Sequence, residues 1–186
     1  MPQNVVSMLV FVINALSSLY LIVLMLRFWL PWLRADFRNP LAQGILKLTS
    51  PVVVPLRRIV PSFGRLDSAT ILVAFAVQYL ALTLILMITG YQAAVSAIAI
   101  TALVKLVLLS LNLFMLAIFV RIILSWISPG QYNPATAIIS TLTEPVLRPV
   151  RNLIPSIGGF DISPVFALIA LGALARLIMG FNQLGI

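Results

Sequence analysis

The sequence contains no cysteine and no histidine, and only four of its 186 residues are Asp or Glu. Without cysteine and histidine the chain has no disulfides, thiolate nucleophiles, imidazole bases or usual zinc ligands. Charged residues make up 9% of the chain, whereas about a quarter of the residues in a soluble domain are charged. This shortage of charge excludes an ordinary soluble domain.

Apolar residues are abundant: 62% of the chain is hydrophobic and the mean hydropathy is +1.15. This composition indicates an all-α, multi-pass membrane protein. A helix needs about 20 apolar residues to cross the hydrocarbon core. The first apolar segment lacks the basic leading region and cleavage site of a secretory signal, so we expect it to stay attached. The four predicted spans are residues 5–26, 68–90, 97–121 and 162–180.

Residues 27–67 recur without a gap as residues 121–161, and 16 of the 41 aligned pairs are identical. The identities group into an Arg-x4-Trp, an Asn-Pro and a Pro-x3-Pro-x-Arg-x3-Pro-x2-Gly-x2-Asp pattern. In the first copy the pattern residues are Arg27, Trp32, Asn39, Pro40, Pro51, Pro55, Arg57, Pro61, Gly64 and Asp67. In the second they are Arg121, Trp126, Asn133, Pro134, Pro145, Pro149, Arg151, Pro155, Gly158 and Asp161. We predict two repeats, residues 1–90 and 91–186, with connectors at 27–67 and 121–161.

The basic residues are concentrated in the two connectors, with seven in residues 27–67 and three in residues 121–161. Because Lys and Arg are retained on the cytoplasmic side, we expect both connectors to face the cytoplasm. Two spans per repeat then place the copies in parallel orientation, with both termini on the non-cytoplasmic side. Anionic lipid explains the net charge of +8 better than nucleic acid does, since the chain has no basic-aromatic recognition module.

Both connectors have apolar residues at three- and four-residue steps, the spacing of one helix face. With basic residues beside that face, the pattern is typical of an amphipathic helix on, or dipping into, the headgroup region. A proline inside a helix removes an amide donor and clashes with the preceding turn. We therefore expect Pro51, Pro55, Pro145 and Pro149 to break each connector into two short helices.

The two copies of this pattern, each flanked by apolar helices, resemble the YggT family, also called YlmG-like, of bacterial and plastid integral membrane proteins. The two-copy form is similar to the proteobacterial members, so the implied location is the bacterial inner membrane. Relatives are associated with osmotic tolerance and ion homeostasis, with division, and in plastids with maturation of a membrane cytochrome. The second copy departs at two positions, where Asn152 and Gly159 replace Arg58 and Arg65.

Two pairs of motif residues have alternative interpretations. Asp67 and Asp161 precede spans, where a carboxylate caps a helix or pairs on the surface; the alternative is an acid pair as in aspartic proteases. Arg27 and Arg121, each five residues before a tryptophan, fit anchors at the headgroup level. The alternative is that they converge with the arginines at 57 and 151 as a basic pocket for an anionic headgroup.

We expect a non-enzymatic membrane scaffold or assembly factor without a cofactor. Its expected partners are anionic lipids, an unidentified membrane protein and a further copy of the chain. The alternative is a small oligomeric channel or transporter component in ion or osmotic balance. The four spans contain no acid, and their interior charges, Lys105 and Arg176, lie toward the outer face, which argues against a pump. An enzyme is the third and most remote hypothesis.

Overall fold

The computed structural model describes residues 2–62, 64, 66–127, 133–154 and 161–185. Within these ranges the chain forms six helices and no strand: α1 (Gln3–Trp32), α2 (Pro40–Arg57), α3 (Ser68–Thr89), α4 (Val95–Ile127), α5 (Pro134–Leu153) and α6 (Ser163–Met179). Helices α1, α3 and α4 are long and apolar enough to cross a membrane, and α6 is apolar but shorter. The expected all-α membrane protein is confirmed.

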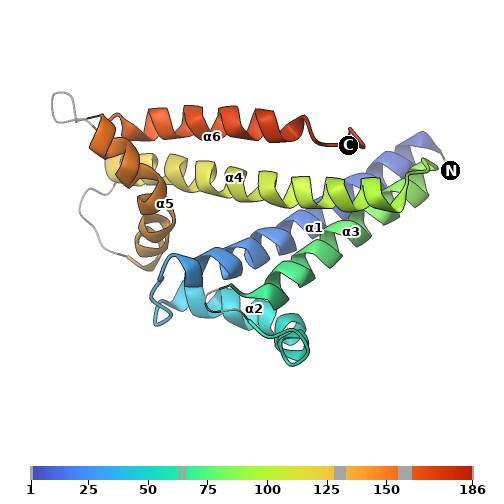
Figure 1. Ribbon diagram of the computed structural model, residues 1–186, viewed down its shortest axis with the longest axis horizontal. Helices are drawn as coiled ribbons and strands as arrows, with labels where there is room; N and C mark the ends of the chain where they lie inside the picture. The colour runs from blue at the N-terminus through green and yellow to red at the C-terminus, as the bar shows by residue number, and fades with distance from the viewer. Residues whose placement is uncertain (1, 63, 65, 128–132, 155–160, 186) are drawn as a thin grey trace.

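The helices are arranged as two parallel repeats (Figure 1). Helices α1 and α4 run in one direction and α3 and α6 return, while α2 and α5 lie together at one end of the molecule. The two chain termini lie at the opposite end. We call the end that carries α2 and α5 the linker end.

Each repeat packs its two long helices together, α1 on α3 and α4 on α6, and α3 and α4 join the repeats. One core cluster includes Leu24, Val53, Ala69 and Leu106, and so ties α1, α2, α3 and α4 together. A second cluster near the linker end includes Leu30 and Ala42 from the first repeat and Phe114 and Leu142 from the second. The linker helices are therefore part of the inter-repeat core.

Helices α1 and α4 are longer than the predicted spans. Helix α1 continues past Arg27 to Trp32, and α4 continues past Arg121 to Ile127. Neither arginine ends its helix, because each turns its guanidinium onto the neighbouring linker helix, to Thr49 and Thr143.

The expectation that prolines divide each connector into two short helices is wrong. Pro51 and Pro55 lie inside α2, and Pro145 and Pro149 lie inside α5. Carbonyls in the turn before Pro51 gain side-chain donors, since Leu46 O accepts from the Arg27 guanidinium at 3.3 Å and Ile45 O accepts from Thr49 Oγ1 at 2.6 Å. Pro51 itself removes the backbone donor of Lys47 O. The burial of Ala42, Thr49 and Val53 against other helices outweighs that loss.

Both linker helices begin at the Asn-Pro pairs. Asn39 Oδ1 accepts from Leu41 N at 2.9 Å, and Asn133 Oδ1 accepts from Thr136 N at 2.8 Å. Proline follows each asparagine, where its missing N–H is one that a helix leaves unpaired in any case. The repeated Asn-Pro therefore marks a capped helix start.

Candidate functional site

Two polar clusters lie at the linker end, one in each repeat. Cluster one contains Arg27, Thr49, Arg57, Asp67 and Thr70. Cluster two contains Arg121, Thr143, Glu144, Arg151 and Asp161. In each, an arginine of the first long helix binds a threonine of the linker helix, and an arginine of the linker helix binds the aspartate that precedes the next long helix. The duplication has thus preserved a pattern of contacts.

Cluster one is buried apart from Arg57, whose side chain is 43% exposed. Arg27 Nη1 donates to Thr49 Oγ1 at 2.6 Å, and Arg27 Nε lies 3.7 Å from Asp67 Oδ2. The same Asp67 oxygen accepts from Arg57 Nη2 and, at 2.6 Å, from Thr70 Oγ1. Arg27 and Asp67 are 3% and 4% exposed. Burial opposes ionisation of Asp67, but the hydrogen bonds from Arg57 and Thr70 outweigh it and lower the pKa of the carboxyl.

Cluster two is more exposed and has one more acid. Glu144 replaces a serine at the matching position of α2 and binds both Arg121 Nη1 at 3.0 Å and Arg151 Nη1 at 3.1 Å. Arg151 Nε also donates to Asp161 Oδ2 at 2.8 Å. Partial burial opposes ionisation, but the arginines beside Glu144 and the bonds from Ser163 and Arg151 to Asp161 lower the pKa of both carboxyls. Two positive and two negative charges therefore balance.

The two aspartates have different surroundings. Asp67 is the N-cap of α3 and accepts from Thr70 N at 3.4 Å. Asp161 accepts from Ser163 N at 3.0 Å, while Ile162 occupies the cap position of α6. An acid pair requires one carboxyl with a raised pKa, but the pKa of each aspartate is lowered. Asp67 therefore caps α3 and forms ion pairs, whereas Asp161 forms an ion pair without occupying the cap position of α6.

The arginine and the tryptophan of each Arg-x4-Trp motif lie in different surroundings in the structure. Trp32 and Trp126 are exposed near the linker-end termini of α1 and α4. Arg27 is buried, so it does not extend to a headgroup phosphate as the anchoring interpretation expects. Nor do the four arginines converge, because the first repeat's pair lies in cluster one and the second repeat's pair in cluster two. Their predicted lipid or partner binding stays a prediction.

Other motif residues take part in turns. Gly64 has φ of +60°, in the left-handed region that glycine adopts without strain. Ser68 Oγ donates to Pro61 O at 2.6 Å, which closes the turn before α3. The matching Pro155 and Gly158 lie outside the described residues. Among the described residues there is no group of three or more acidic, His or Cys side chains that fits a metal ion.

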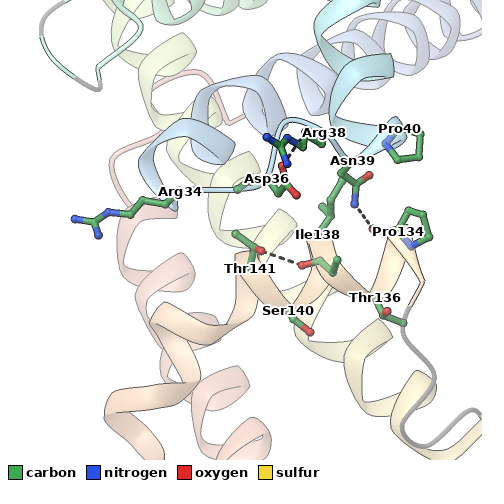
Figure 2. A pocket seen from close by; sticks show the side chains of 12 residues that line it. Arg34, Asp36, Arg38, Asn39, Pro40, Pro134, Thr136, Ile138, Ser140 and Thr141 are labelled. Atoms are coloured by element: carbon green, nitrogen blue, oxygen red, sulfur yellow. Dashed lines mark hydrogen bonds between the residues drawn. The ribbon is translucent and has the colours of Figure 1, made fainter.

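A cleft between the repeats was not predicted. It has a volume of about 720 Å³ and is lined by the loop before α2 and the first turns of α5 (Figure 2). Asn39 Nδ2 donates to Pro134 O at 2.7 Å and so joins the two linker helices across it. Arg34 and Arg38 line the cleft and have no ion pair among the described residues. The repeated Asn-Pro was the only sequence signal for this meeting point.

Comparisons with known proteins agree on one family. The family model described as CCB3/YggT matches residues 6–88 and again residues 100–182. An uncharacterized protein of Pseudomonas aeruginosa is 40% identical over 172 residues, which cover 91% of this chain and 87% of that protein. The uncharacterized protein YggT of Escherichia coli strain K12 is 34% identical over 163 residues, which cover 88% of this chain and 85% of that protein. The chloroplastic YlmG homolog protein 2 of Arabidopsis thaliana is 38% identical over 66 residues, which cover 34% of this chain and 25% of that protein. No solved structure matches.

Proposed function

The chain belongs to the CCB3/YggT family, and we propose that it is a non-enzymatic membrane scaffold that holds anionic lipid or a membrane-protein partner at its linker end. The two helical hairpins form the frame, and the surface around α2 and α5 makes the contact. The two-repeat match and the long apolar helices support this frame.

The observation that carries the proposal is an excess of unpaired basic side chains over free carboxylates at the linker end. Three of the four carboxylates are engaged by arginines inside the two clusters, and the fourth, that of Asp36, accepts from the Arg38 amide at 2.8 Å. In the described part of the chain, five basic side chains at this end have no ion pair: Arg34, Arg38, Lys47, Arg58 and Arg148. Each cation near an anionic bilayer surface contributes about 1 kcal/mol of attraction.

The same charge bias supports an orientation. Because Lys and Arg are retained on the cytoplasmic side, the linker end faces the cytoplasm and both termini face away from it. The location proposed for it in a bacterium is the inner membrane. A role in osmotic stress, division or the biogenesis of membrane complexes would then depend on what the linker end holds.

The alternative, a channel or transporter component, has one observation in its favour. Lys105 faces a cavity of about 500 Å³ at the end opposite α2 and α5, together with Asn14, Gln92 and Gln183. In the residues described, Lys105 has no acidic partner. An ionisable side chain that faces a cavity within a span is typical of an ion pathway.

The test compares native nanodiscs excised around the full chain. A variant with Arg38, Lys47 and Arg58 changed to Gln should carry less anionic lipid and capture fewer partner proteins than the wild type. Arg176→Gln, near the far end of α6, is the matched control and should change neither. Unaltered lipid and partner content in the triple variant would refute the scaffold proposal. Ion flux in liposomes that is lost in Lys105→Met would favour the alternative.

A further inference from the structure

An apolar groove of about 580 Å³ lies where α1, α4 and α5 meet. Its walls include Phe28, Val107 and Leu111. The few polar atoms along it are satisfied, because Trp29 Nε1 donates to Ser110 Oγ at 3.3 Å and Ser110 Oγ donates to its own helix. An occupant that lies here therefore needs no hydrogen bonds, which is the property of a hydrocarbon chain.

A polar cleft of about 530 Å³ adjoins the groove, since Leu33 and Pro145 line both. The cleft also contains Arg34 and Arg148, and neither side chain has an ion pair among the described residues. The one acid there, Glu144, is already bound by two other arginines. Its charge is therefore balanced, and the two free arginines give the cleft a net positive charge.

Arg34 is held at the mouth of the cleft by an unusual backbone. Its φ of 57° is the one positive value for a non-glycine residue in the described chain, and glycine is the common residue at such a helix end. The turn is fixed by bonds from Arg34 N to Pro31 O at 3.2 Å and from Ala35 N to Leu30 O at 2.9 Å. In Figure 2 the Arg34 side chain points away from Arg38 and Asn39. A cation thus occupies a position where the backbone favours glycine.

We propose that this continuous surface binds one anionic phospholipid, with its phosphate between Arg34 and Arg148 and an acyl chain in the apolar groove. The inference rests on the scaffold function and names the ligand of its linker end. Arginine binds phosphate oxygens through paired hydrogen bonds, and both volumes lie within the roughly 300–1,000 Å³ of ligand pockets. A free phosphate would leave the apolar groove unfilled, and the apolar face of a partner helix would leave the two arginines unmatched.

The test is native mass spectrometry of the full chain in detergent, with phosphatidylglycerol or phosphatidylcholine added. The wild type should retain one phosphatidylglycerol per chain and little phosphatidylcholine. Arg34→Gln and Arg148→Gln should each weaken retention about tenfold, because each removes hydrogen bonds to a charged group. Arg176→Gln, an exposed arginine near the far end of α6, should leave retention unchanged.

A second pair of variants tests the groove. Val107→Trp places a large ring on the groove wall and should abolish retention, while Leu116→Trp changes a more exposed position of α4 outside the groove and should not. Inorganic phosphate at millimolar concentration should not displace the lipid. Each variant is checked by thermal unfolding, and all five positions are exposed enough for the chain to fold.

Several outcomes would overturn the lipid site: no bound lipid in the wild type, equal retention of both lipids, full retention in the two arginine variants, or complete displacement by inorganic phosphate with no effect of Val107→Trp. If the nanodiscs are still enriched in anionic lipid while no single lipid is retained, the site is wrong and the scaffold proposal stands. If a lipid is retained but the triple variant changes nothing, the scaffold proposal fails instead.

Discussion

Replacing Asp67 by Asn should destabilise the protein far more than replacing Asp161 by Asn, although the two aspartates occupy matching positions in the repeats. Asp67 is buried and is the one carboxylate within 4.0 Å of Arg27 in the described chain. Asp161 is exposed, and its partner Arg151 keeps a second carboxylate, Glu144, at 3.1 Å. Loss of the Asp67 carboxylate leaves the buried Arg27 unpaired. Loss of the Asp161 carboxylate leaves Arg151 paired with Glu144.

The magnitudes differ accordingly. Removing one partner of a buried ion pair costs about 3–5 kcal/mol, whereas an exposed pair contributes about 0–1 kcal/mol. A chain of this size shifts its melting temperature by about 2–4 °C per kcal/mol. Asp67→Asn should therefore lower the melting temperature by roughly 6–20 °C, and Asp161→Asn by less than about 4 °C.

The assay is thermal unfolding in detergent at pH 7, followed by tryptophan fluorescence. The control is Arg27→Met combined with Asp67→Asn, which removes both buried charges and should recover most of the loss. Because the pKa of Asp67 is lowered by Arg57 and Thr70 against the effect of burial, its contribution is present at neutral pH and is lost as the pH falls below about 4. The difference in melting temperature between the wild type and Asp67→Asn should therefore become smaller in that acidic range. Equal shifts for the two single variants, or no recovery in the double variant, would refute the reasoning.

Three further predictions concern the linker end. Asn39→Asp keeps the cap of α2 but loses the bond to Pro134 O, so we expect it to destabilise the protein by about 1 kcal/mol; an unchanged midpoint of thermal unfolding would contradict this. Single cysteines at Gln43 and Ser140, both exposed, should react with an impermeant thiol reagent only after the cytoplasmic face is opened, and labelling of just one from outside would show that the proposed orientation is wrong. Partial burial opposes ionisation of Glu144, but its two arginines lower the pKa of the carboxyl. Glu144→Gln should therefore cost less than about 1 kcal/mol at pH 7, and the cost should shrink as the pH falls below about 4, as measured by thermal unfolding across that range.

The sequence was sufficient to predict the fold class and the parallel repeat, because both follow from patterns that are visible in the order of the residues alone. Apolar runs of membrane length predict helices, and an ungapped copy at a fixed offset predicts equivalent placement. The proline prediction failed for a physical reason. Propensity treats Pro51 as a helix breaker, but α2 is held by the packing of Val53 in the core and by Arg27, a side-chain donor from another helix that binds Leu46 O. Such a donor is visible only in three dimensions.

The site was predicted in its residues more than in its contacts. Arg57 and Asp67, and Arg151 and Asp161, were singled out as motif residues, and the structure joins each pair. The burial of Arg27 and Asp67 could not be predicted, since it depends on how the linker helix packs on the long helices. The positions that line the inter-repeat cleft and the adjoining groove are also mostly not repeated between the two copies. A search for repeated residues therefore finds only a few of them, such as the Asn-Pro pairs.

The difference between the two copies separates stability from recognition. A motif kept in both repeats must serve something that both need, and here it fastens each linker helix to its hairpin through an arginine, a threonine and an aspartate. Arg34 has a serine at its matching position and Arg148 matches a valine, so these cations belong to one copy each. The proposed lipid site then forms only where the two different copies meet. A symmetric duplication would offer two equivalent surfaces, and divergence at these unpaired positions leaves one.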